Sequence, residues 1–173
     1  MIKVIVTDTN AQNTLDYALD LSAIASGATL RLSQSSSYFY ADFRKDGQVA
    51  VSSSSSSWLS SFSNGSTIGK SASWYRYGSV SMSSGSSGLF GFRVNQGKGG
   101  SDYTYGWFKV TTVSSSAFTL NSYGYNSTLN ADAIAGQGNA TGVPDSGPGI
   151  VGLALLGAGA AGVRLLRKLR AGK

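Results

Sequence analysis

Apolar and polar residues alternate through much of the first 125 residues, and this pattern limits the chain to a fold built from strands. Successive side chains of a strand point to opposite faces, so alternation gathers the apolar side chains on one face. The strongest strand candidates are residues 89–94, 103–113 and 118–125, which are rich in aromatic and β-branched residues. Weaker candidates are residues 2–6, 29–32, 38–43, 48–53, 73–77 and 79–82.

The segment 15–21 admits two interpretations. Its apolar residues alternate with Asp16 and Asp20, which favours a strand. Leu15, Ala18 and Leu19 also fit the helical period of 3.6 residues, so a helix remains an alternative.

Turn-forming residues separate the strand candidates at short and regular intervals. Asp46-Gly47 and Asn64-Gly65 are typical hairpin or loop pairs, and glycines recur at residues 85–88 and 97–100. Short strands at this spacing, with no long amphipathic helix among them, predict an all-β fold. We therefore expect residues 1–135 to form an antiparallel β-sandwich with jelly-roll-like connections.

The residue types that the chain lacks exclude several kinds of site. The sequence contains no Cys, no His and no Glu, and all eight acidic residues are Asp. Disulfides, zinc sites with N and S ligands, and a Ser-His-Asp triad are therefore excluded or improbable. The scattered Asp residues form no motif, so we expect neither a cofactor nor catalysis. A glycosidase that uses a pair of carboxylates is the enzymatic alternative.

The net charge of +6 belongs mainly to the end of the chain. Residues 1–142 hold nine basic and seven acidic side chains, a balance of only +2. A nucleic-acid-binding protein usually spreads its basic residues over a face of the domain, so no nucleic-acid partner is expected. Five of the 14 basic residues lie in the last ten positions: Arg164, Arg167, Lys168, Arg170 and Lys173.

An apolar segment directly precedes this basic cluster. Residues 149–163 carry no charge, and a helix over residues 149–166 would be about 27 Å long at about 1.5 Å per residue. The hydrocarbon core of a bilayer is about 30 Å thick, so residues 149–173 are expected to form a short transmembrane helix with a basic tail. A buried helix of a soluble domain is the alternative. The positive-inside rule places the tail in the cytoplasm and residues 1–148 across the membrane.

That topology requires export of the body. Residues 1–10 contain one Lys and Asp8 and lack the apolar stretch of a signal peptide. We expect the true start of the gene to lie upstream, with a gene fragment or unconventional export as alternatives.

A short motif stands immediately before the apolar segment. Its five residues are Val143, Pro144, Asp145, Ser146 and Gly147. Followed by an apolar segment and a terminal Arg/Lys cluster, this arrangement resembles the VPDSG-CTERM sorting domain, a relative of the PEP-CTERM signals. The resemblance covers about 31 residues at the C-terminus. An ordinary Pro-Asp turn followed by a helix N-cap is the alternative interpretation of the pentapeptide.

The resemblance implies a place and a partner for the protein. A membrane-embedded exosortase would recognise the motif and release the body, which passes through the inner membrane of a Gram-negative bacterium to the cell surface or the extracellular space. Residues 136–148 would form the flexible linker that presents the motif. Such systems accompany extracellular polysaccharide, which is therefore a candidate partner. A permanently anchored single-pass membrane protein or adhesin is the alternative.

The body offers weaker indications of its role. Residues 88–137 resemble the end of a body domain common among PEP-CTERM substrates, which implies a β-sandwich without catalytic residues. Exposed aromatic rings could stack on sugar rings, whereas the competing interpretation places the same rings in the core or in cross-strand pairs. The rings considered are those of Trp58, Trp74, Tyr75 and Tyr77.

Overall fold

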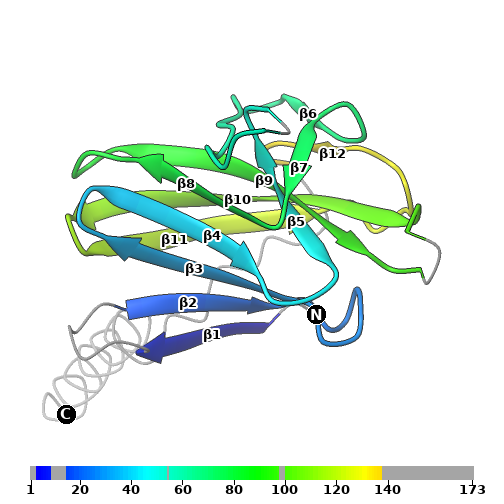
Figure 1. Ribbon diagram of the computed structural model, residues 1–173, viewed down its shortest axis with the longest axis horizontal. Coiled ribbons are helices and arrows are strands. Elements are labelled where there is room, and N and C mark those ends of the chain that lie inside the picture. Colours follow the sequence, from blue (N-terminus) through cyan, green and yellow to red (C-terminus); the bar gives the residue numbers. More distant parts are fainter. Residues whose placement is uncertain (1–2, 9–14, 54, 98–99, 138–173) are drawn as a thin grey trace, which may run out of the picture.

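The computed structural model describes residues 3–8, 15–53, 55–97 and 100–137, and this part of the chain is all-β with antiparallel sheets (Figure 1). One five-stranded sheet, here the first sheet, contains the N-terminal strands. In spatial order its strands are β1 (Lys3–Asp8), β2 (Leu15–Asp20), β3 (Thr29–Ser35), β4 (Tyr38–Phe43) and β8 (Tyr77–Ser81).

The second sheet also has five strands, and a two-stranded sheet accompanies it. The second sheet runs in the order β11 (Ala117–Tyr125), β10 (Tyr103–Ser114), β9 (Ser87–Asn95), β5 (Gly47–Val51) and β7 (Ser73–Tyr75). The small sheet pairs β12 (Ala133–Ile134) with β6 (Thr67–Ile68).

One hydrophobic core lies between the two large sheets. The first sheet contributes Leu30, Leu32 and Phe39, and the second contributes Phe90 and Phe108, all of them buried. The Phe39 ring stacks on that of Phe90 with 5.7 Å between centroids. The expected alternation is therefore real: the apolar side chains of each sheet face the other sheet, as in a β-sandwich.

The segment 15–21 is a strand, not a helix. Residues 15–20 form β2, which pairs with β1 on one side and with β3 on the other. Leu19 is fully buried between these neighbours, whereas Ala18 lies opposite Arg31 on the other face of the sheet. Pairing with two neighbours satisfies the backbone groups that a helix would have bonded internally.

The expected jelly-roll-like connectivity is wrong. A jelly roll is made of Greek keys, in which a fourth strand returns beside the first. Here β1 to β4 follow one another as a meander, and β9, β10 and β11 do the same in the second sheet. Two-residue connections at residues 36–37 and 115–116 fix two of these pairings, β3 with β4 and β10 with β11, because so short a loop returns the chain directly beside the strand it leaves.

The chain crosses between the sheets at Arg76, within a segment that the sequence predicts as one strand. Residues 73–75 belong to the second sheet and residues 77–81 to the first. The Phe43 amide donates to the Arg76 carbonyl, and Arg76 Nε donates to the Phe43 carbonyl, each at 3.0 Å. These bonds hold the crossing point against the end of β4.

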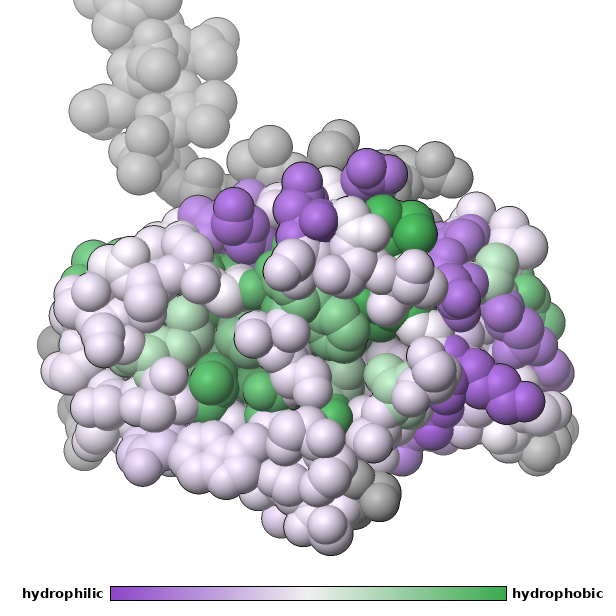
Figure 2. Space-filling model, turned by 90° about the horizontal axis from the view of Figure 1, so that it is seen from above, coloured by the Kyte–Doolittle hydropathy of each residue, from purple (hydrophilic) through white to green (hydrophobic). Residues whose placement is uncertain are grey.

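A third layer covers the outer face of the second sheet. Ile68 of β6 and Ala133 of β12 pack with Leu89, Tyr105 and Trp107, and this second cluster is buried. Figure 1 shows β6 and β12 together at the top of the molecule, and Figure 2 looks down on that side. Apolar residues lie in the middle of the view and strongly hydrophilic ones gather toward one end and along one rim.

The described body continues to Gln137, two residues beyond the expected end of the domain. The amide of Gly65 donates to the Ala135 carbonyl, and Trp107 Nε1 donates to the Gln137 carbonyl. The first two residues of the expected linker, Gly136 and Gln137, therefore follow the third layer directly.

Candidate functional site

The predicted sorting and anchoring residues lie outside the described residues. These are Val143, Pro144, Asp145, Ser146 and Gly147, the apolar segment 149–163, and the basic residues Arg164, Arg167, Lys168, Arg170 and Lys173. Among residues 3–137, where the structure describes them, no helix has the length and apolar character to cross a membrane. The candidate site within the body must therefore be sought on the sandwich itself.

Exposed aromatic side chains single out one face of the sandwich. Of the four aromatic residues considered for sugar stacking, Trp58, Tyr75 and Tyr77 are exposed, with 49%, 39% and 50% of their surface accessible. Tyr38 and Tyr40 of β4 are also exposed. We call these five residues the aromatic row. They are all of the exposed aromatic side chains among the described residues, and all seven Phe are buried or half-buried.

Trp74 does not belong to the row. It is half-buried on the outer face of the second sheet, where its ring lies 5.7 Å from that of Tyr105. The interpretation as a packed aromatic residue is therefore confirmed for Trp74. Trp58, Tyr75 and Tyr77 are exposed, although each also contacts another ring: Trp58 contacts Tyr38, and Tyr75 contacts Tyr77.

The strand pattern of β4 explains why its tyrosines point outward. Its sequence Tyr-Phe-Tyr-Ala-Asp-Phe alternates, so Phe39 enters the core while Tyr38 and Tyr40 face away from it. Antiparallel pairing with β8 places Ser81 opposite Tyr38 and Ser79 opposite Tyr40. Small serine side chains therefore lie beside both rings.

Trp58 reaches the same face from the Ser-rich segment. The Leu59 amide donates to the Ser79 carbonyl and the Ser79 amide donates to the Ser57 carbonyl, both at 2.8 Å. Trp58 and Ser79 thereby form a parallel bridge along the free edge of β8. Since bridged residues share a face of a sheet, Trp58 lies across Ser79 from Tyr40.

The rings of the row form two groups whose members contact one another. The Tyr38 ring lies 6.1 Å from Trp58 and 6.4 Å from Tyr40, tilted by 41° and 47°. Tyr75 and Tyr77 form an edge-to-face pair at 5.0 Å. Tyr77 pairs with Asp42 and is therefore the diagonal neighbour of Tyr40. The row crosses β4 and β8 and is longer than a single ring.

A charged group borders one end of the row. Asp42 follows Tyr40 on the same face of β4 and lies opposite Arg31 on β3 and Tyr77 on β8. Burial raises the pKa of the Asp42 carboxyl above its ordinary value, and the charge of Arg76 opposes that rise. The rings of Trp58, Tyr38 and Tyr40 lie farther along, beside serines.

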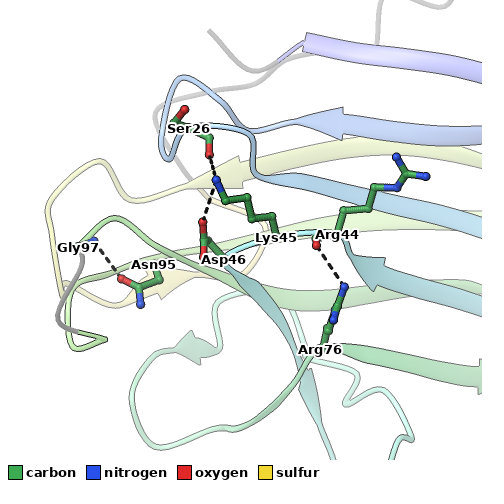
Figure 3. Close-up of polar contacts among 7 residues, drawn as sticks. All are labelled: Ser26, Arg44, Lys45, Asp46, Arg76, Asn95 and Gly97. Carbon is green, nitrogen blue, oxygen red and sulfur yellow. Dashed lines mark hydrogen bonds and ion pairs between the residues drawn. The ribbon is translucent and has the colours of Figure 1, made fainter.

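A second candidate lies at the end of the sandwich where β4 turns into β5. A cavity of about 340 Å³ is lined by Arg44, Lys45, Arg76 and Asn95, among others. Figure 3 shows how local contacts occupy these side chains: Lys45 Nζ donates to the Ser26 carbonyl at 3.5 Å and lies 3.8 Å from Asp46 Oδ2. Arg76 Nη2 donates to the Arg44 carbonyl at 3.2 Å. Arg44 and Lys45 are exposed and could attract an anion.

A third candidate surrounds Arg93 on the second sheet. Its guanidinium lies 4.0 Å from the Tyr103 ring and 5.0 Å from the Trp74 ring, and it donates to Gln48 Oε1. These contacts hold Arg93 between two rings, where its charge interacts with their π faces. A cavity of about 540 Å³ beside it is lined by Lys70, Arg93, Gly100, Ser101, Tyr103, Tyr105 and Asn130.

Three acidic side chains of the described body make local contacts. Asp20 Oδ1 accepts the Ser22 amide, Asp46 lies beside Lys45, and Asp102 Oδ1 accepts a bond from Asn130. Within the described ranges, no three His, Cys, Asp or Glu residues come close enough together to hold a metal ion.

Of these candidates, the aromatic row offers the largest set of exposed side chains that a ligand could contact. Sequence reasoning missed Tyr38 and Tyr40, although the alternation of Tyr with Phe along β4 carries the necessary signal. Comparison of the chain with protein-family models, with curated proteins and with solved structures finds no match.

Proposed function

We propose that this chain is an exported bacterial surface or matrix protein that carries an exosortase-type sorting signal at its C-terminus. The observation that carries the proposal is the order of three sequence features: residues 143–147 match the VPDSG motif, an uncharged segment follows, and a cluster of Arg and Lys ends the chain. The apolar segment is marginal in length for a membrane span, which suits temporary retention before cleavage.

The β body is compatible with this role. It is an antiparallel sandwich whose surface is rich in serine, and its fold needs no disulfide because the sequence has no Cys. In this proposal the body acts by binding extracellular material, polysaccharide above all, and not by catalysis. The sequence leaves only residues 138–142 between the described body and the motif.

Cleavage can be tested by following both ends of the protein. The full gene with its upstream DNA would be expressed in a Gram-negative host that contains an exosortase, and fractions would be blotted with antibodies to the body and to residues 164–173. We expect a shortened body in the medium or on the cell surface that lacks the C-terminal epitope. A single full-length form that stays in the membrane would instead support the permanently anchored alternative.

Matched variants locate the signal. Replacement of Pro144 and Asp145 by Ala should abolish the shortened form and leave full-length protein in the membrane. The control replaces Asn139 and Thr141 by Ala in the neighbouring linker and should be cleaved normally. Equal processing of both variants would show that the motif is not what the enzyme recognises.

A further inference from the structure

The aromatic row is unusual because the chain otherwise keeps its aromatic residues inside. All seven Phe are buried or half-buried, and so are Trp74 and Trp107. The five exposed rings are all Tyr or Trp. Tyr38, Tyr40 and Tyr77 lie on β4 and β8, Trp58 bridges to the edge of β8, and Tyr75 ends β7 of the second sheet and contacts Tyr77. Clustered exposed aromatic side chains mark interaction sites more often than scattered ones do.

The shape of the row suits a polymer built from rings. The Tyr38 ring contacts those of Trp58 and Tyr40, and Ser79 and Ser81 lie opposite Tyr40 and Tyr38 on β8, so the three rings form a continuous series bordered by hydroxyl groups. Indole and phenol rings offer a large apolar face and one polar tip. A pyranose with equatorial hydroxyls has the complementary form, since its C–H bonds make an apolar face and its hydroxyls project from the rim.

The charges near the row narrow the choice of ligand. Ser33, Ser35, Ser79 and Ser81 flank Tyr38 and Tyr40, whereas the charged residues Asp42, Arg31 and Arg76 lie toward the end of the row that holds Tyr75 and Tyr77. An acidic chain would find its complement at Arg44 and Lys45, on the turn that follows β4. The row therefore matches an uncharged chain better than an anionic one.

A protein partner would use the row differently. Binding energy in protein interfaces concentrates in side chains that enter well-packed, desolvated pockets. Here the rings of Trp58, Tyr38 and Tyr40 lie tilted against one another on the outer face of a sheet, with centroids 6.1 and 6.4 Å apart and small serine side chains beside them. The exposed aliphatic side chains Ile5, Val113 and Leu129 lie on other strands or loops and do not extend the row into one apolar patch.

We propose that the aromatic row, with Trp58, Tyr38 and Tyr40 at its centre, is the binding site for a neutral polysaccharide of equatorially linked pyranose units. The sugar rings stack on the aromatic faces, and Ser79 and Ser81 lie within reach of the hydroxyls. This inference deepens the role proposed above for the body, but it does not depend on whether residues 143–147 are cleaved.

Binding can be measured on the full chain, purified in a detergent without sugar groups. The probes are a soluble neutral β-1,4-glucan, hydroxyethylcellulose, and an acidic polysaccharide, alginate, each included in a native gel that retards a protein that binds it. We expect retardation by the neutral glucan that persists in high salt. We also expect the glucan to protect Trp58 from fluorescence quenching by acrylamide, since Trp58 is the most exposed of the three Trp: Trp74 is half-buried and Trp107 is only 3% exposed.

Variants test the site. Trp58→Ala and Tyr38→Ala should each weaken binding about tenfold, equivalent to about 1.4 kcal/mol, whereas Trp58→Phe should retain most of it because a flat ring remains. The matched control is Val113→Ser, an exposed apolar side chain, 60% accessible, at the far end of β10. Unchanged thermal unfolding of each variant would show that the body is intact.

Each other outcome overturns the inference. Salt-sensitive binding of alginate that survives in Trp58→Ala would move the site to the cationic turn at Arg44 and Lys45. Glucan binding that is equal in Trp58→Ala and Val113→Ser would exclude the row. Binding of neither polysaccharide, with capture of a protein that depends on Trp58, would identify a protein-docking surface. None of these results bears on sorting, which the blotting experiment decides separately.

Discussion

The outer faces of the two large sheets carry aromatic residues in similar positions, but these residues are buried on one sheet and exposed on the other. On the second sheet, Tyr105 and Trp107 of β10 are 2% and 3% exposed because the third layer covers them. On the first sheet, Tyr38 and Tyr40 of β4 are each 40% exposed. Both pairs sit at alternate positions of a strand, so the strands themselves do not determine which pair is buried.

The covering segments make the difference. Ile68 of β6 and Ala135, which follows β12, are both fully buried and pack over the outer face of β10 from other parts of the sequence. Gly91 beneath them has no side chain, and a Cβ there would lie 2.9 Å from Ile68. On the first sheet the residues opposite Tyr38 and Tyr40 are Ser81 and Ser79, whose side chains are too small to cover the rings. The comparison teaches that one aromatic face completes the fold, whereas the described residues leave the other exposed, where we propose that a ligand binds.

The largest effect is expected from removing a ring of the covered face. Trp107→Ala should lower the free energy of unfolding by about 3–5 kcal/mol, because it empties a buried site and removes the bond from Nε1 to the Gln137 carbonyl. Urea denaturation of the full chain, followed by near-ultraviolet circular dichroism, measures the change. A loss below about 1 kcal/mol would mean that the third layer contributes little.

A bulky residue under the third layer should separate it from the sheet. Gly91→Val should lower the free energy of unfolding by about 1–3 kcal/mol, since its side chain meets Ile68, Phe62 and Ala50 at 2.9 to 3.3 Å. Faster hydrogen exchange at Ile68 and Ala135 would show that the layer has moved. The matched control is Ser33→Val on the outer face of β3, where we expect nearly unchanged stability and exchange.

The exposed face should tolerate the same truncation that the covered face does not. Trp58→Ala should change the free energy of unfolding by less than about 1 kcal/mol, because about half of the residue is already exposed and its ring packs on Tyr38, which is itself exposed, with 6.1 Å between centroids. The same urea experiment compares it directly with Trp107→Ala. Equal destabilisation by the two variants would contradict the distinction between a structural and a binding face.

Strand positions were the part of the fold that the sequence revealed best. Alternation locates β4, β9, β10 and β11 within a few residues because each buries one face against the other sheet. The two-residue strands β6 and β12 have no detectable period, and the break at Arg76 depends on bonds to Phe43 and Arg44, which are distant in sequence. The meander order likewise follows from loop geometry that alternation does not encode.

Only part of the candidate site could be predicted from the sequence. Trp58, Tyr75 and Tyr77 could be identified as aromatic residues in a polar stretch, but their exposure depends on which sheet the third layer covers. Trp74, one residue before Tyr75, is half-buried against Tyr105 for that reason. The sorting motif is a local sequence feature and needs no tertiary structure, so it remains a prediction independent of the fold.

The smallest effect concerns the carboxyl at the end of the aromatic row. Burial raises the pKa of Asp42 above its ordinary value of about 3.9, against the attraction of Arg76. Between the unfolded and the folded pKa, the native protein binds more protons than the unfolded chain does. The contribution of Asp42 to stability therefore falls as the pH rises through this window, and the cost persists at higher pH.

Asp42→Asn removes this ionisation and should separate the two forms by pH. Near pH 3 the Asp42 carboxyl is largely protonated in both the native and the unfolded protein, so the variant and the wild type should be nearly equal in stability. At pH 7 the variant should be slightly more stable. Carbon-13 NMR titration of the Asp42 carboxyl measures its pKa directly. A wild type that is more stable than the variant at pH 7 would mean that attraction by Arg76 and the opposing Arg31 outweighs burial, and that this end of the row carries a well-compensated charge.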